Sequence, residues 1–451
     1  MQFKQYPIYK NSGVEWLGDV PEHWESNRLK KYLIERNEKN SPIKTDNLLS
    51  VTMYQGVIPV SEKQGNGGNK PKENLENYKI SYPNDIVLNS MNVIVGSVGL
   101  NKYTGLISPA YYALYNRNKN NNIKFFSYIF HNPFFQKGLF GLGNGIMYKE
   151  SEDGKLNTIR LKIPMEKLNQ VVLPCPSISE QNQIISFLDT ETARIDTLIA
   201  KQEKLIELLE EQRKSIISHA VTKGLNPNAP MKDSGVEWLG EVPEHWMTPS
   251  SKHLLEIPIT DGPHETPNFV DDGVPFISAE AISKGKIDFD KKRGYITPEL
   301  NAIYSKKYSP KIEDIYMVKS GATTGKVAMV GTTEEFNIWS PLAVFRCNKN
   351  KVLPKFLLAV FNSSHFYDAL VLNWSYGTQQ NIGMGVLSNI EIPCPPLKEQ
   401  AEIIQHLDAQ NTKFDKLIST QSQLIEKLKE YRSSIISHAV TGKIDVREFV
   451  A

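Results

Sequence analysis

Two blocks of this 451-residue sequence occur twice, in the same order. A short block, KNSGVEWLGDVPEHW at 10–24, returns as KDSGVEWLGEVPEHW at 232–246. A longer block at 174–222 returns at 393–441, where 27 of its 49 positions are identical, including the run SIISHAVT. The segments between these blocks share little. A repeated frame around unrepeated segments predicts two equivalent halves that carry different surfaces.

The longer block has the residue pattern of one continuous helix. Its apolar residues recur every seven positions, and neither copy contains Gly or Pro within the helical stretch. Such sustained heptads predict a coiled coil, on the order of 60 Å long for about 43 residues. Two helices buried in separate globular cores are the alternative, although helices this long seldom serve one small core. The main heptad positions are Leu188, Ile195, Gln202, Leu209 and Ile216 in the first copy and Leu407, Phe414, Gln421, Leu428 and Ile435 in the second; a second track holds Ile184, Leu198 and Leu205, then Leu417 and Leu424.

Each copy carries one glutamine on its main apolar track, Gln202 and Gln421. A polar residue at such a position costs stability but can fix the register of a coiled coil. In an antiparallel pair related by a pseudo-two-fold axis, equivalent residues face each other only near the centre. Because Gln202 lies near the midpoint of 179–222, we predict that the two amides meet across the helix pair.

The segments between the repeated blocks have the patterns of mixed α/β domains. Apolar, β-branched runs broken by Gly at 82–100 and 312–331 predict strands, and helical apolar spacing appears at 124–140 and 355–371. We therefore expect an α+β chain with two mixed α/β domains separated by two long antiparallel coiled-coil helices, in a circular, pseudo-two-fold repeat. The expected boundaries are a first domain at 1–178, a central helix at 179–222, a second domain at 223–397, a C-terminal helix at 398–441 and a tail at 442–451.

Charge is distributed unevenly, although the net charge is only +2. Residues 25–172 contain 20 Lys and Arg against 12 Asp and Glu, whereas residues 247–391 contain 15 of each. A basic balance suits a polyanion such as DNA, because neutralised phosphates release counterions. A soluble protein rich in Lys and Asn is the alternative interpretation.

Other sequence features indicate a cytoplasmic protein that does not enter a membrane. No apolar run approaches the roughly 18–20 residues that span a bilayer, and the first residues lack a signal-peptide core. Cys175, Cys347 and Cys394 are too few for a disulfide framework or a spaced metal site.

Each segment that resembles a catalytic motif departs from that motif at a required position. SGATTGK at 320–326 has three residues between its glycines where a phosphate-binding loop needs four, and Val327 stands in place of the Ser or Thr that holds magnesium. GLGNG at 141–145 and HNPFF at 131–135 have the wrong order and composition for an adenine methyltransferase. The nine His residues form no metal-binding cluster, and His219 and His438, which repeat within SIISHAVT, point to packing or subunit contact. We expect no catalytic site, cofactor or metal.

Polar loops next to glycines have side chains suited to DNA. Amide side chains can pair bidentately with adenine in the major groove, and hydroxyl or lysine side chains can hold phosphates. In each half these loops follow the same predicted elements, which favours DNA contact over solvated loops. The candidate DNA-binding residues are Asn89, Ser90, Asn92, Asn144, Tyr148 and Lys149 in the first half and Ser320, Thr323, Thr324, Lys326, Gln379, Gln380 and Asn381 in the second.

The order of these features resembles the specificity subunits of type I restriction–modification systems. The helix-entry motifs PCPSISEQ at 174–181 and PCPPLKEQ at 393–400, the VEWLGxVPEHW segments and the GTQQNI loop at 377–382 carry the resemblance, which covers essentially the whole chain. The first half departs from the pattern, because it lacks a clear GxTQ loop.

This resemblance implies a non-catalytic subunit whose two target recognition domains each read half of a bipartite target in double-stranded DNA. The helices would set the unread gap and dock two methylation (M) subunits, and restriction (R) subunits would complete the complex. Methyltransferase and ATP-dependent endonuclease activities would then belong to those partners. A coiled-coil scaffold with protein-binding domains is the alternative function, and an enzyme with an unfamiliar site is a third.

Overall fold

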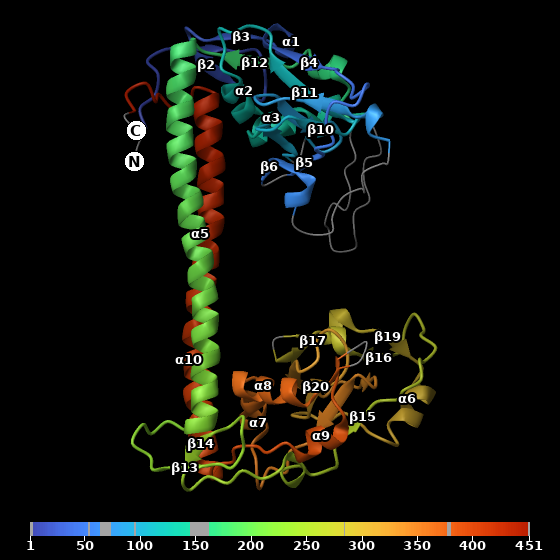
Figure 1. Cartoon of the computed structure of the whole chain (residues 1–451). Helices are drawn as coiled ribbons and strands as arrows, with labels where there is room; N and C mark the ends of the chain where they lie inside the picture. The colour runs from blue at the N-terminus through green and yellow to red at the C-terminus, as the bar shows by residue number, and fades with distance from the viewer. Residues whose placement is uncertain are drawn as a thin grey trace. The chain divides into compact units, whose positions relative to one another are not determined.

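The computed structural model describes residues 3–52, 55–63, 74–93, 96–144, 162–283, 285–376 and 380–449. The chain forms two compact units, of which the first combines segments from both ends of the sequence and the second is one continuous stretch (Figure 1). The first unit contains residues 1–202 and 423–451, and the second contains residues 203–422. Each unit therefore combines one globular domain with half of each long helix.

The first unit is built around a four-stranded antiparallel sheet with the order β4-β11-β8-β9. Buried aromatic side chains of helix α2 lie in the same core cluster as residues of this sheet. Its strands and helices are β1 (Tyr9–Asn11), β2 (Asp19–Pro21), β3 (Glu25–Arg28), α1 (Leu29–Tyr32), β4 (Leu33–Arg36), β5 (Leu49–Thr52), β6 (Gly56–Pro59), β7 (Lys79–Ser81), β8 (Ile86–Asn89), β9 (Val98–Leu100), β10 (Gly105–Ile107), β11 (Tyr111–Asn116), α2 (Ile123–Phe130), α3 (Pro133–Gly138), α4 (Met165–Leu168) and β12 (Val172–Cys175).

The second unit contains a four-stranded sheet with the order β15-β23-β20-β21. Chain order and pairing match those of the first unit, so the two domains share a sheet topology although their sequences differ. Its elements are β13 (Met231–Asp233), β14 (Glu241–Pro243), β15 (Thr260–Asp261), β16 (Val274–Ile277), β17 (Ile282–Ser283), β18 (Lys286–Ile287), β19 (Gly294–Ile296), α6 (Pro298–Tyr304), β20 (Ile315–Val318), β21 (Val327–Met329), β22 (Asn337–Ile338), β23 (Leu342–Phe345), α7 (Pro354–Phe361), α8 (Ser364–Asn373), β24 (Ser375–Tyr376), β25 (Gln380–Asn381) and α9 (Met384–Asn389).

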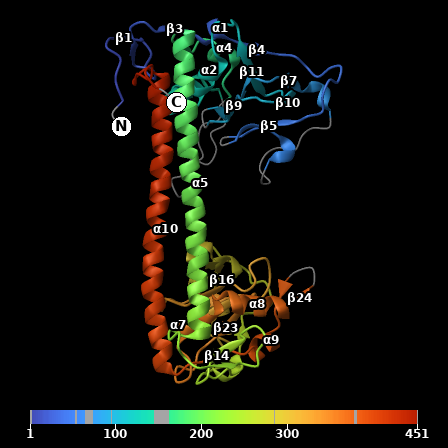
Figure 2. The same cartoon turned by 60° about the vertical axis from the view of Figure 1, so that its left-hand side comes forward.

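The two repeated blocks form the long helices α5 (Ile178–Lys223) and α10 (Leu397–Val440). Within each unit, the halves of these helices lie side by side and run in opposite directions (Figures 1 and 2). In the first unit, Arg432 pairs with Asp196 at 2.8 Å. In the second unit, Arg213 makes the equivalent ion pair with Asp415 and lies 5.7 Å from the Phe414 ring centre. These contacts confirm the predicted antiparallel packing.

The two predicted apolar tracks of the helices differ in how deeply their residues are buried. Most main-track residues are buried or half-buried, as Leu188, Ile195, Leu407 and Ile435 show. The second track is not a continuous seam, because Leu417 is 46% exposed. Two paired helices cover only a narrow stripe of each other, and an α-helix drifts relative to a strict seven-residue repeat.

The short repeated block forms a hairpin that joins a helix end to a helix start. In the first unit this hairpin is β1–β2, followed by the fully buried Trp24. The Trp24 indole donates to Glu180 in the first turn of α5 at 3.0 Å, and the Lys443 ammonium, just after α10, donates to the Asp19 carbonyl. Glu180, which is itself buried, therefore fixes the hairpin to the start of the helix.

The second unit repeats this joint with its own residues. Hairpin β13–β14 leads to the buried Trp246, His245 pairs with Glu399 at 2.8 Å, and Lys223 donates to the Glu241 carbonyl. The repeated Glu and Lys thus join equivalent elements in both units, which explains why the two separated blocks repeat together.

The Gln of each helix-entry motif links the globular domain to its helix. The Gln181 side chain accepts from the backbone amide of Asn122 at 2.8 Å and donates to the Pro176 carbonyl at 2.9 Å. Gln400 accepts from the Leu353 amide at 2.8 Å and donates to the carbonyls of Lys351 and Pro395. Both glutamines are completely buried, so their hydrogen bonds replace those that water would make.

Candidate nucleic-acid interface

The predicted polar loops of the second unit meet at one end of its sheet. The loop at 319–326 connects β20 to β21, and β24–β25 supplies the neighbouring hairpin. Ser320 forms a backbone bridge with Asn381, and the Ile382 amide donates to the Lys319 carbonyl at 2.9 Å. The structure therefore brings together two segments that are some 60 positions apart in the sequence.

The candidate residues in the loop at 319–326 differ in their accessibility. Lys326 is exposed and Thr323 half-buried, whereas Thr324 is buried and its hydroxyl donates to the Gly321 carbonyl at 2.7 Å. The turn depends on Gly325, which has a φ of +88° and faces the side chains of Tyr367 and Leu370.

The hairpin of the GTQQN segment is described only in part. The backbone of Gln380 pairs with Tyr376, and Asn381 is exposed. Gln379 lies outside the described residues, as does the side chain of Gln380. Their expected contacts with bases therefore remain predictions from the sequence.

The first unit places its candidates at the corresponding end of its sheet. Asn89 ends β8, and its side chain accepts from the Met91 amide at 3.0 Å, while Asn92 is exposed. Ser90 is buried and donates to the Ala110 carbonyl at 2.7 Å, so its hydroxyl already has a partner. Asn144 is exposed and accepts from Lys167 at 3.0 Å.

The backbone arrangement next to these loops is the same in both units. In the first unit the Ile163 amide donates to the Ser90 carbonyl, as Ile382 does to Lys319 in the second. In the first unit Asn144 forms a backbone bridge with Lys162, and at the corresponding place in the second unit Ser375 pairs with Asn381. Tyr148 and Lys149 follow Asn144 and lie outside the described residues.

A charged cluster beside the loop at 319–326 was missed by the sequence analysis. Asp261, at the end of β15, is 1% exposed and contacts Lys307 at 2.6 Å, His264 at 3.1 Å and Lys319 at 3.2 Å. Burial alone would raise the pKa of this carboxyl, but the hydrogen bonds and charges of Lys307 and Lys319 outweigh it and hold the pKa below its usual value. Only the run DGPH at 261–264 signalled a polar turn here.

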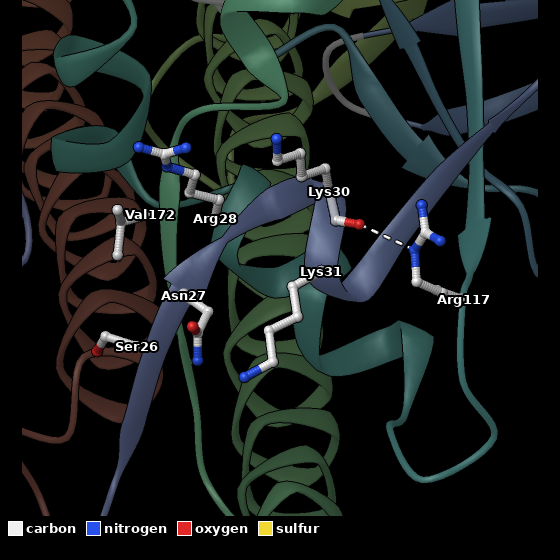
Figure 3. Close-up of a pocket in the computed structure, with 7 residues that line it drawn as sticks. All are labelled: Ser26, Asn27, Arg28, Lys30, Lys31, Arg117 and Val172. Carbon is white, nitrogen blue, oxygen red and sulfur yellow. Dashed lines mark hydrogen bonds between the residues drawn. The ribbon is translucent and has the colours of Figure 1, made fainter.

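A second basic surface lies at the other end of the first unit's sheet. A groove of about 600 Å³ is lined by Arg28, Lys30, Lys31 and Arg117, together with Ser26, Asn27 and Val172 (Figure 3). Arg117 follows β11 and donates to the Lys30 carbonyl at 2.9 Å. Because β11 pairs its first residue with Asn89 and its last with Leu33, this groove and the candidate loops lie at opposite ends of the sheet.

The histidines of the repeated SIISHAVT run and the glutamines of the helix register lie away from the candidate loops along the chain. Among the described residues no group of three or more His, Cys, Asp or Glu is placed to hold a metal ion. His219 lines a polar groove with Ser218 and His365, and the His438 ring lies 3.3 Å from the Ser434 hydroxyl. The pairing of Gln202 with Gln421 stays a prediction.

Two topologically equivalent domains, each with polar loops at one end of its sheet and a long repeated helix, define a modular two-domain protein. The description "Type I restriction modification DNA specificity domain" belongs to a family model that matches residues 243–430. The comparisons confirm the resemblance: the chain is similar to the specificity subunits of type I restriction–modification systems. Specificity subunits are the non-catalytic members of these systems.

Individual relatives agree with this assignment. The putative specificity subunit of the MjaX enzyme of Methanocaldococcus jannaschii is 25% identical, and the alignment covers 99% of both chains. The MjaVIII specificity subunit of the same organism is 26% identical over 61% of this chain and 63% of its own length. For the EcoBI specificity subunit of Escherichia coli these values are 23%, 61% and 59%. The chain thus spans about three fifths of the latter two proteins.

A solved structure supports the fold. A chain from work on complex assembly and conformational transition of the type I R-M system matches with a TM-score of 0.64 at 14% identity, over 93% of this chain and 98% of that chain. At this identity the match concerns the fold alone. No helix in the described ranges is both long enough and apolar enough to cross a membrane.

Proposed function

We propose that each globular domain reads one half of a bipartite target in double-stranded DNA. The observation that carries the proposal is the equivalence of the two sheets, which present different side chains at the same end. In the first domain the exposed candidates there include Asn92 and Asn144, and in the second they include Lys326 and Asn381. One framework with two sets of side chains is what recognition of two different half-sites requires.

The candidate contacts are the residues named from the sequence. Gln379, Gln380 and Asn381 would read bases in the second half-site, whereas Lys326 and Thr323 would contact phosphates or base edges. Asn89, Asn92, Asn144, Tyr148 and Lys149 would serve the first half-site. Ser90 and Thr324, which are buried, would support the loops from beneath.

The two long helices would set the gap between the half-sites and dock two methylation subunits, and restriction subunits would join the complete complex. Domain boundaries at 1–178, 179–222, 223–397 and 398–441 fit this division of labour. We place the complex in the cytoplasm, where the free thiols of Cys175, Cys347 and Cys394 would remain reduced.

Exchange of one domain tests the proposal. Replacing residues 25–172 with the matching domain of a relative should change one half-site of the methylated target and leave the other half-site and the gap unchanged. The measurement is methylome sequencing of a host that expresses the chimaera with the methylation subunits. A change in both half-sites, or in the gap alone, would contradict modular recognition.

Side-chain truncation tests the second domain. Replacing both Gln379 and Gln380 with Ala should relax one half-site, because each bidentate pair between an amide and a base contributes about 1–3 kcal/mol of discrimination.

A gel shift with the methylation subunits present and absent tests the scaffold alternative, because a scaffold that binds only protein would retain no duplex in either case.

A further inference from the structure

A buried carboxylate contacts two lysines and a histidine at the end of the second domain's sheet where the candidate loops lie. Asp261 is 1% exposed, and its two oxygens have different partners. Oδ1 accepts from the Lys307 ammonium at 2.6 Å, whereas Oδ2 lies 3.2 Å from Lys319 Nζ and 3.1 Å from His264 Nε2. The two lysines outweigh the single carboxylate, so the cluster carries a net positive charge even with a neutral imidazole.

The two lysines and the histidine differ in what they can reach. Lys319 is only 12% exposed, so it can contact little beyond the protein. Lys307 is 52% exposed and His264 is 71% exposed. The Lys307 ammonium has three donors, of which Asp261 Oδ1 and the Gly262 carbonyl at 3.4 Å take two. Lys307 therefore presents a held, partly exposed ammonium to the surface.

Lys319 connects this cluster to both candidate loops. Its amide donates to the Pro341 carbonyl at 2.8 Å, and its carbonyl accepts from Ile382. The next residue, Ser320, bridges to Asn381. Asp261 thus holds the side chain of a residue whose backbone joins the loop at 319–326 to the β24–β25 hairpin.

We propose that Lys307 contacts a DNA backbone phosphate beside the half-site read by the second domain, and that Asp261 and Lys319 are positioning residues for this contact. The inference rests on the proposed function and deepens it. A phosphate is the fitting ligand because the cluster offers a fixed ammonium beside base-reading loops, and phosphate contacts set the orientation of a protein on a duplex without reading its sequence. The alternative is that the ion pairs only hold the segment around Lys307 against the sheet.

Salt dependence distinguishes these roles. Each phosphate neutralised by a cation steepens the plot of log affinity against log salt by about 0.9. The full chain in complex with methylation subunits is titrated with a fluorescent duplex of random sequence at several KCl concentrations. Lys307→Ala should reduce this slope by about 0.9 and weaken binding, whereas Lys307→Arg should restore the slope. The preference for the methylome-defined target over the random duplex should not change.

Lys349 provides the matched control. It is 62% exposed and also pairs with an acidic residue, Glu313, but it follows β23 and lies at the opposite end of the same sheet. Lys349→Ala removes the same charge and should leave the slope at the wild-type value. Equal slopes for Lys307→Ala and Lys349→Ala would overturn the phosphate contact.

Asp261→Asn separates positioning from simple charge. This change makes the domain more positive by one charge, so general attraction predicts tighter binding to the random duplex. Loss of positioning instead predicts weaker binding and a shallower slope. Circular dichroism reports whether this variant folds, and if it does not, the lysine variants decide the proposal. A wild-type complex that binds no duplex would overturn the proposed function itself, whereas binding without an effect of Lys307 would overturn only this inference.

Discussion

At the scale of the residue, the fully buried Gln400 does more than begin a helix. Its side chain joins the start of α10 to the Lys351–Leu353 segment through two hydrogen bonds and donates a third to the Pro395 carbonyl. Gln400→Ala would remove these bonds and leave their backbone partners without the amide. We predict a loss of about 1–3 kcal/mol in the free energy of unfolding. Denaturant titration followed by circular dichroism measures this loss.

Gln405 is the control for this prediction, because it lies on the same helix and is exposed. Gln405→Ala should change the unfolding free energy by about 0.5 kcal/mol or less. Equal effects of the two substitutions would show that the buried amide contributes nothing to the joint between the domain and its helix.

The thiols of the buried Cys347 and the half-buried Cys175 give a prediction about reactivity. Burial raises the pKa of Cys347 to about 12, and it raises the pKa of Cys175 to about 11. Only the thiolate attacks alkylating reagents, so both groups should stay protonated and unreactive at pH 8. Quantifying iodoacetamide adducts by mass spectrometry should show slow labelling in the native chain and rapid labelling in denaturant. Rapid native labelling of Cys347 would contradict this prediction.

The sequence located the polar loops where one short segment carries the information, whereas their DNA contacts stay predictions. The loops at 89–92 and 320–326 follow equivalent strands, and the structure places both at the same end of their sheets. The cluster around Asp261 could not be predicted, because Asp261, Lys307 and Lys319 come from separate segments and meet only after the sheet has formed.

At the scale of the element, the apolar tracks of the helices make unequal contributions. Leu407 is 4% exposed and belongs to the core of the second unit, whereas Leu417 on the same helix is 46% exposed. Leu407→Ala should cost about 2–5 kcal/mol, because the variant buries less apolar surface and leaves a cavity. Leu417→Ala makes the same chemical change at the surface and should cost much less. Thermal and denaturant unfolding of both variants would test this, and similar losses would show that Leu417 is buried too.

The long helices were more predictable than the strands. The expected helices at 179–222 and 398–441 agree with α5 and α10 to within one residue at each end, because heptads without Gly or Pro act over many turns. Most strands have only two to four residues, and their pairing depends on distant partners, as between β4 and β11. Periodicity within such short runs does not identify those partners.

At the scale of the whole molecule, both chain ends contribute to the first unit. The Asp445 amide donates to the Lys4 carbonyl at 2.8 Å, and the Lys4 side chain pairs with Glu448 at 2.6 Å. Phe187 of α5 contacts the rings of both Phe3 and Phe449. The hairpin at the start of the chain therefore packs where α10 ends, just as the hairpin at 232–246 packs where α5 ends.

This equivalence predicts that the chain tolerates circular permutation. Met1 and Ala451 lie outside the described residues, but Lys4 and Glu448 are in contact, so a short linker should join the ends without strain. New termini placed within 226–231 would fall in a largely exposed, Pro- and Asn-rich segment after α5, where an opening is best tolerated. The permutant should unfold at a temperature close to that of the wild type, and methylome sequencing should return the same two half-sites and gap. A control permutant opened within α5, at 195–200, should fail to fold, because the cut interrupts a helix that both units share. If the loop permutant folds and binds the methylation subunits but directs methylation to a different sequence, recognition depends on chain order and the pseudo-symmetric architecture is wrong.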